Sequence, residues 1–206
     1  MQNIFNEYYK KYDAWYDKHP KAFLSELEAV KKLLPKKGNG LEIGVGTGRF
    51  ASALNISTGI DPAEAMVEIA RQRGIDACVG TGECLPYKEE IFDYVLIVIA
   101  LCFVQDPPEV LKQAHRVLKE KGRIIIGIVD KDSFLGKFYQ EKISVFYKNA
   151  RFFSVSELTE LLDRVGFHNM SYFQTISKSP DAITALEEPQ KGFGQAGFVV
   201  VGASKR

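Results

Sequence analysis

The stretch Leu41-Glu42-Ile43-Gly44-Val45-Gly46-Thr47-Gly48-Arg49-Phe50 decides the fold. Its apolar start is typical of a short buried strand, and three glycines at alternate positions allow a tight turn and close approach to a ligand. The spacing is G-x-G-x-G, which differs from the G-x-G-x-x-G of dinucleotide-binding proteins. Glu42, two residues before the first glycine, would repel a pyrophosphate but could attract a cationic amine. A strand-to-helix turn with no ligand is the alternative for this stretch taken alone.

Downstream, apolar strand patterns alternate with helix patterns of ten to fifteen residues. This alternation predicts βαβ units and a mostly parallel sheet, in which ligands bind beyond the carboxyl ends of the strands at a topological switch point. We expect helices over 63–73, from 107 to near 122, and over 156–165. The expected strands cover 40–45, 58–60, 75–79, 92–100, 123–129, 168–177 and 197–204.

Residues 4–34 are predicted to be helical, with Pro20 breaking the helix or starting a second one. Aromatic side chains recur at helical spacing along the first part: Phe5, Tyr8, Tyr9, Tyr12, Trp15 and Tyr16. This stripe either packs in the core or walls a substrate site. The expected inner face of the second helix carries Phe23, Leu24, Leu27, Val30, Leu33 and Leu34.

Composition restricts the class of protein. The 206 residues carry 27 Lys and Arg against 26 Asp and Glu, and this near-neutral balance disfavours nucleic acid as the main partner. The cysteines, Cys78, Cys84 and Cys102, form no C-x-x-C pair, so we expect a reducing cytoplasm and no metal site. The longest uncharged run, 94–105, is shorter than the ~20 residues of a membrane helix, so no membrane partner is expected.

The end of the second strand carries an acidic residue, Asp61, in Gly59-Ile60-Asp61-Pro62. A carboxylate there can accept hydrogen bonds from both hydroxyls of an adenosine ribose. The same side chain is expected to cap the next helix, in a capping box with Glu64 and with Pro62 at the first helical position.

The motifs taken together resemble the class I S-adenosylmethionine-dependent methyltransferases. They read E-x-G-x-G-x-G at 42–48, G-I-D-P at 59–62, G-T-x-E-x-L-P at 80–86, F-D-Y-V at 92–95 and H-R-V-L-K-x-x-G-R at 115–123. The likeness covers roughly residues 38–130 and is strongest to the small single-domain branch of ubiquinone and menaquinone biosynthesis methyltransferases. It implies a Rossmann-like, doubly wound α/β fold: a seven-stranded, mostly parallel sheet with an antiparallel last strand, helices on both faces and an N-terminal helical cap. The single domain, 1–206, would comprise the cap (1–35), a cofactor-binding core (36–130) and a lid with the C-terminal helix and strands (131–206).

The resemblance also implies S-adenosyl-L-methionine as cofactor, with S-adenosyl-L-homocysteine as its product. Glu42 would face the cofactor's amino group, the glycines would pass under its methionine tail, and Asp61 would hold the ribose. Thr81 and Gly82 would read the adenine edge, although many relatives have Asp at the Thr81 position. The implied cofactor-binding set is Glu42, Gly44, Gly46, Gly48, Asp61, Pro62, Met66, Thr81, Gly82, Ala100 and Leu101.

The methyl acceptor is expected to be a small molecule, with no nucleic acid or membrane partner; monomer and dimer both stay open. Its predicted pocket contains Tyr12, Trp15, Tyr16, His19, Cys102 and Phe103. Residues 131–153 are rich in aromatic and basic side chains and are either an aromatic wall or an amphipathic lid helix.

No residue can be assigned as catalytic from the sequence. No histidine follows a core strand, and Asp130 is the one carboxylate that could serve as a general base. The absence of a clear base slightly favours N-methylation of an amine. O- or C-methylation of a phenol or quinol, and a non-catalytic cofactor-binding module, remain the alternatives. Asp106-Pro107-Pro108-Glu109 resembles the D-P-P-Y motif of amino-methyltransferases but is expected to be only a helix start.

Overall fold

The computed structural model describes residues 2–148 and 150–206; Met1 of the expected cap and Asn149 of the expected lid lie outside the described residues. Within that part of the chain one sheet has the strand order β3-β2-β1-β4-β5-β8-β6-β7. β1 to β5 pair in parallel, β8 is antiparallel to both neighbours, and β7 is antiparallel to β6. The expected doubly wound sheet is confirmed, with the two-residue β7 as an addition at its edge. The strands are β1 (Gly40–Ile43), β2 (Thr58–Asp61), β3 (Asp76–Val79), β4 (Phe92–Val98), β5 (Leu118–Val129), β6 (Phe167–Thr175), β7 (Gln190–Lys191) and β8 (Phe198–Lys205).

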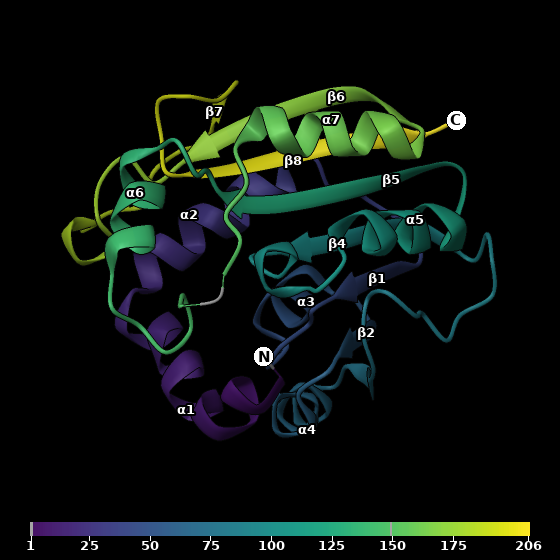
Figure 1. The fold of residues 1–206 in the computed structure, drawn as a ribbon, viewed down its shortest axis with the longest axis horizontal. Coiled ribbons are helices and arrows are strands. Elements are labelled where there is room, and N and C mark those ends of the chain that lie inside the picture. Colours follow the sequence, from purple (N-terminus) through teal and green to yellow (C-terminus); the bar gives the residue numbers. More distant parts are fainter. Residues whose placement is uncertain (1, 149) are drawn as a thin grey trace.

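Helices cover both faces of the sheet (Figure 1). Side chains of β4 alternate between two apolar cores: Tyr94 and Leu96 lie in one, Val95 and Ile97 in the other. The first core includes residues of α2, α3 and α4, and the second includes residues of α5 and α7. The helices are α1 (Gln2–Lys18), α2 (Pro20–Lys31), α3 (Arg49–Leu54), α4 (Glu64–Gln72), α5 (Pro107–Val117), α6 (Phe134–Glu141) and α7 (Val155–Val165), with short 3-10 turns η1 (Leu101–Phe103) and η2 (Pro180–Ala182).

The N-terminal helices have the predicted break. Pro20 is the first residue of α2, where its missing N–H costs nothing. Leu24, expected on the inner face of α2, is 37% exposed, while the polar Ser25 and Glu26 are buried. The buried face of α2 is therefore rotated from the one that hydrophobicity alone predicts. Figure 1 shows α1 and α6 beyond the ends at which β1, β4 and β5 terminate.

Two helix starts test the predicted caps. Asp106 precedes α5 and accepts a hydrogen bond from the Glu109 backbone N–H at 3.0 Å, as expected of a helix start. The predicted box at Asp61 and Glu64 is wrong: α4 begins at Glu64, and Ala63 precedes it without a side-chain cap. α5 ends at Val117 rather than near Gly122, because the chain turns extended at Leu118 and enters β5 there.

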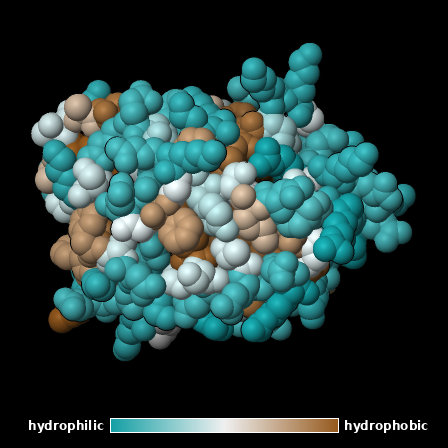
Figure 2. Space-filling view, turned by 90° about the horizontal axis from the view of Figure 1, so that it is seen from above, coloured by the Kyte–Doolittle hydropathy of each residue, from teal (hydrophilic) through white to brown (hydrophobic). Residues whose placement is uncertain are grey.

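The surface in Figure 2 is largely hydrophilic, with apolar side chains in separate patches. No helix in the described part of the chain combines the length and hydrophobicity needed to cross a membrane.

Candidate active site

Two adjoining cavities lie at the carboxyl ends of β1 and β4, where the strand order reverses. The loop cavity, of about 360 Å³, is lined by the glycine turn after β1 and by the ends of β2 and β4. The aromatic cavity, of about 380 Å³, lies under α1, α2 and α6. Tyr12, Ile99 and Phe103 line both, so one ligand in each cavity would meet at these three side chains.

The glycine turn has a backbone that other residues rarely adopt. Gly44, Gly46 and Gly48 have φ values of 74°, 52° and 80°. A Cβ on Gly44 would overlap that of Ala100, so the glycine lets the ends of β1 and β4 approach closely. A Cβ on Gly46 would lie 3.7 Å from the Met66 sulfur, inside the loop cavity. The turn is thus held open toward a ligand.

Asp61 organises this turn. Its Oδ2 accepts a hydrogen bond from the Gly46 N–H and its Oδ1 accepts one from the Ala63 N–H, both at 2.9 Å. The side chain is buried, and burial raises its pKa even though these two hydrogen bonds oppose the shift. Asp61 therefore joins the ends of β1 and β2 while lining the loop cavity.

Most of the expected cofactor set is brought together. Of the expected residues, those that line the loop cavity are Gly44, Gly46, Asp61, Pro62, Met66, Thr81, Gly82 and Ala100. The other three expected residues, Glu42, Gly48 and Leu101, do not line it. Glu42 is 2% exposed behind the turn, its Oε2 has no hydrogen-bond partner among the described residues, and burial raises its pKa. Gly48 is the N-cap residue that precedes α3, and Leu101 lines the aromatic cavity instead.

The expected acceptor residues cluster with one exception. Tyr12, Trp15, Tyr16, Cys102 and Phe103 line the aromatic cavity. The structure does not place His19 there. Its ring is buried against that of Trp15, with centroids 5.1 Å apart, and its Nδ1 lies 3.8 Å from Asp181. His19 precedes α2, and it faces η2 rather than the cavity.

Glu26 is the residue that sequence reasoning missed. It lines the aromatic cavity, is 3% exposed, and its Oε2 has no hydrogen-bond partner within the described chain. Burial raises its pKa to about 8. The sequence holds a signal: Glu26 is three residues after Phe23 and four before Val30, so a helix places a carboxyl on an apolar stripe.

Ile99 was also missed. This β-branched residue has a φ of 49° at the end of β4, and it lies where the two cavities meet. Such a conformation is costly, and strained residues of this kind gather at functional sites. No local sequence pattern marks it.

Asp130 does not line either cavity, which removes the base considered from the sequence. Its Oδ1 accepts a hydrogen bond from the Asp132 N–H at 3.3 Å in the loop after β5. Both interpretations of residues 131–153 hold in part. α6 is a short packed helix, and the rings of Tyr139 and Tyr147 pack in a tilted arrangement with centroids 4.8 Å apart at the wall of the aromatic cavity.

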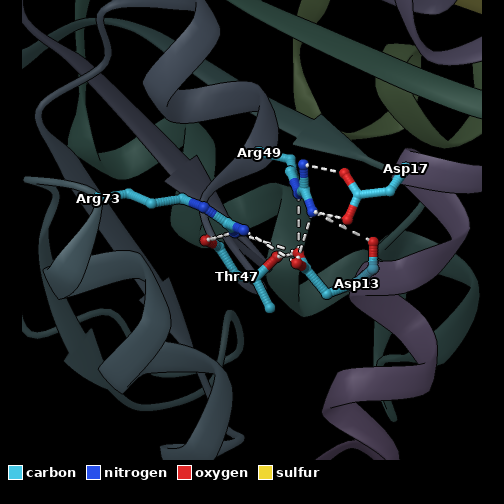
Figure 3. A network of polar contacts seen from close by, with 5 residues as sticks. All are labelled: Asp13, Asp17, Thr47, Arg49 and Arg73. Atoms are coloured by element: carbon cyan, nitrogen blue, oxygen red, sulfur yellow. Dashed lines mark hydrogen bonds and ion pairs between the residues drawn. The ribbon is translucent and has the colours of Figure 1, made fainter. Parts of the chain in front are cut away.

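A polar network fastens α1 to the glycine turn (Figure 3). Asp13 accepts hydrogen bonds from Arg49 and Thr47 of the turn and from Arg73 at the end of α4, and Asp17 adds a second partner for Arg49. Although burial opposes it, hydrogen bonds from Arg49, Arg73 and Thr47 hold the pKa of Asp13 well below its usual range. The network thereby fixes α1, whose side chains line both cavities, to the glycine turn after β1.

Comparison with known proteins agrees with this arrangement. A family model described as "Methyltransferase domain" matches residues 41–126. The chain is 47% identical to an uncharacterized protein of Methanocaldococcus jannaschii, over 98% of this chain and 99% of that one. It is 23% identical to a demethylmenaquinone methyltransferase of Oceanobacillus iheyensis, over 96% of this chain and 86% of that one.

A solved structure from Thermotoga maritima superposes with a TM-score of 0.98 and 49% identity over the whole of both chains. That protein is described as a SAM-dependent methyltransferase and possible histamine N-methyltransferase. Together with the sheet order and the loop cavity, these likenesses show that the chain belongs to the class I S-adenosylmethionine-dependent methyltransferases.

Proposed function

We propose that this methyltransferase transfers a methyl group to the nitrogen of a small amine, with the cofactor in the loop cavity and the amine in the aromatic cavity. The observation that carries the proposal is the pair of cavities meeting at Tyr12, Ile99 and Phe103. Two ligands placed this way can be held as a near-attack pair, which supplies roughly 7–11 kcal/mol of a bimolecular barrier.

The loop cavity has the features that S-adenosylmethionine requires. Gly46 leaves room where a side chain would project, the Asp61 carboxylate lines the cavity and would accept hydrogen bonds from ribose hydroxyls, and Met66 would pack on adenine. Thr81 and Gly82 would contact the adenine edge, and Ala100 would lie nearest the reacting end. These roles, with Glu42 and Gly48 supporting the turn from behind, are part of the proposal.

When bound, the cofactor supplies an electrophilic methyl group on a sulfonium. The chain's residues position the acceptor and exclude water. Side chains of α1 and α6 line the aromatic cavity, and the Asp13 network keeps α1 in that position. Cys102 is not a nucleophile here, because burial raises the pKa of its thiol to about 12 and keeps it neutral.

The preference for an amine rests on the buried Glu26 carboxyl within an aromatic wall, a combination that suits a cationic organic group. The relative described as a possible histamine N-methyltransferase supports the same reaction class. We further propose the single-domain organisation expected from the sequence, with residues 1–35 as a cap, 36–130 as the cofactor core and 131–206 as lid and C-terminal part.

C-methylation of a quinol is the second candidate, because relatives named demethylmenaquinone methyltransferase align with 96–98% of this chain at 23–26% identity. A flat quinol would also pack on aromatic side chains. For a quinol, which carries no positive charge, Glu26 would have to act as a base for a hydroxyl proton instead of binding a cation, and the aromatic wall would supply packing alone.

The test is methyl transfer from labelled S-adenosylmethionine to a matched panel of 2-phenylethylamine, 2-phenylethanol, 4-ethylphenol and a reduced naphthoquinone. We expect label in the amine, and mass spectrometry to place it on nitrogen. Label confined to the quinol would replace the proposal with the second candidate. No label in any acceptor, with S-adenosylhomocysteine still bound, would favour a non-catalytic cofactor-binding module.

A further inference from the structure

Glu26 is a buried carboxyl that the fold leaves without a partner. It lies in the middle of α2, one of its oxygens makes no hydrogen bond among the described residues, and it borders the aromatic cavity. An unpaired buried carboxylate is costly, so such a group is usually protonated or paired with a cation. The described ion pairs do not include it.

Tyrosines surround this carboxyl from several elements. Burial is the main cause of the raised pKa values of Tyr12, Tyr16, Tyr139 and Tyr147, and the negative charge of Glu26 adds to each of them. All four side chains line the aromatic cavity, together with Trp15. Glu26 is therefore within electrostatic reach of aromatic rings on α1, on α6 and in the segment after α6.

A carboxylate among aromatic rings is complementary to an organic cation. The carboxylate supplies charge and a hydrogen-bond acceptor, and the ring faces attract an ammonium or its methylated product through cation–π interactions. A neutral alcohol or phenol of the same shape would gain neither the charge interaction with the carboxylate nor the cation–π interactions.

We propose that Glu26 binds the positively charged nitrogen group of the methyl acceptor, so that the substrate class is small amines with an apolar or aromatic body. This inference rests on the proposed function and names its acceptor-binding residue. An ammonium has no lone pair, so the nitrogen would give up one proton to solvent before it accepts the methyl group. Glu26 binds the charged amine before transfer and the charged product after it, so it sets binding and specificity and takes no proton itself.

Permanently charged phenyltrimethylammonium tests the site without turnover. Titration calorimetry would compare the wild type with Glu26→Gln, which keeps the shape and removes the charge. Glu28→Gln is the matched control on the same helix, because Glu28 is partly exposed and pairs with Lys31. We expect Glu26→Gln to weaken binding at least tenfold, with S-adenosylhomocysteine affinity and the Glu28→Gln protein unchanged. Equal binding by the wild type and Glu26→Gln would overturn the inference, and so would no binding by the wild type.

The pH dependence of probe binding to the wild type is a second test, and it does not depend on a variant that folds. The probe cannot titrate, so its affinity should follow ionisation of Glu26 and rise about tenfold from about pH 7 to about pH 9. Other groups facing the cavity are the four tyrosines and Cys102, whose raised pKa values keep them neutral, and Lys11 and Lys142 at its edge. Burial lowers the pKa of His19 beside Asp181, below this range. Glu42, buried near Tyr16, could also ionise, and a rise that persists in Glu26→Gln would count against the inference.

Turnover separates this inference from the proposed function. If the wild type methylates 2-phenylethylamine and Glu26→Gln leaves its KM unchanged, the inference fails and the proposed function stands. If no amine is methylated but the probe binds through Glu26, the proposed function fails and an organic-cation site stands. A raised KM for the amine in Glu26→Gln, with near-normal S-adenosylhomocysteine binding, supports both.

Discussion

The Asp13 carboxylate on α1 accepts a 2.6 Å hydrogen bond from the Arg49 guanidinium, which lies directly after the glycine turn. Thirty-six residues separate the two in sequence. Arg73 and Thr47 bind the same carboxylate, so one side chain fixes the N-terminal helix, the turn and the end of α4 relative to one another (Figure 3). The cavity wall formed by α1 is therefore coupled to the loop that lines the cofactor side.

Asp13→Asn should destabilise the protein by about 2 kcal/mol, because charge-assisted hydrogen bonds are lost. For a chain of this length that corresponds to a fall in Tm of roughly 4–8 °C, measured by differential scanning calorimetry. Asp17→Asn is the control: Asp17 is largely exposed, and within the described part of the chain it bonds only to Arg49, so its loss should cost less than about 1 kcal/mol. Equal losses in the two variants would show that the network does not depend on Asp13.

The same network should give acid sensitivity. Hydrogen bonds from the arginines and Thr47 lower the pKa of Asp13 below that of the unfolded chain, despite burial. Its stabilising contribution is then fully present above the unfolded pKa of about 3.8 and is lost as the pH falls below it. Chemical unfolding from neutral pH to about pH 3 should show the gap between wild type and Asp13→Asn narrowing. A constant gap would contradict this assignment.

Asp61→Ala should raise the dissociation constant for S-adenosylhomocysteine at least tenfold while the protein stays folded. Two acceptor oxygens that hold the Gly46 and Ala63 N–H groups would be lost, along with the carboxylate facing the loop cavity. Isothermal titration decides it. Glu64→Ala, at the exposed start of α4, should leave affinity unchanged. Unaltered binding by Asp61→Ala would reduce Asp61 to a structural link between two strands.

Gly46→Val should abolish cofactor binding more completely than Asp61→Ala does. The side chain would project into the loop cavity toward Met66, at a φ that β-branched residues resist. Gly74→Val separates the two causes, because Gly74 also has positive φ and its Cβ would meet nothing within 4 Å. Equilibrium dialysis with labelled cofactor should show binding lost only in Gly46→Val. Loss in both proteins would point to backbone strain rather than a filled cavity.

The pH dependence of the free energy of unfolding should show whether Glu26 is protonated in the folded protein. Burial raises its folded pKa from 4.5 to about 8, so folding favours its protonated form. The free energy of unfolding gained from this preference is fully present below about pH 4.5 and is lost as the pH rises through about 8. The total loss in the free energy of unfolding is up to about 5 kcal/mol. The stability of the wild type relative to Glu26→Gln should therefore fall between about pH 5 and about pH 9, measured by urea unfolding. A flat difference, like that expected for Glu28→Gln, would mean that Glu26 is solvated.

Trp15 should report on the aromatic cavity alone. It is the single tryptophan of the chain, and it lines the aromatic cavity but not the loop cavity. Phenyltrimethylammonium should quench or shift its emission more than S-adenosylhomocysteine does. A larger response to the cofactor product would indicate that α1 moves when the loop cavity fills, which would contradict a cap already fixed by Asp13.

Local sequence pattern determined the core of this protein. The alternate glycines at 44, 46 and 48, the acidic end of β2 and the buried run of β4 each act over a few residues, so the parallel strands and a ligand site at their carboxyl ends followed from spacing. The doubly wound sheet was implied by the family resemblance, and its strand order came from the structure. The helix break at Pro20 followed in the same way, because proline acts on its own backbone.

Only the tertiary structure decided which side chains face the cavities. Glu26 sits on a helix whose buried face is set by contacts with the distant strands β6 and β8, so a face chosen by hydrophobicity placed Leu24 inward and overlooked the carboxyl. The role of Asp61 in holding Gly46 and that of Asp13 in joining α1 to Arg49 and Arg73 depend on segments 15 to 60 residues apart. Such pairs are fixed by the packing of the whole chain, and no local pattern encodes them.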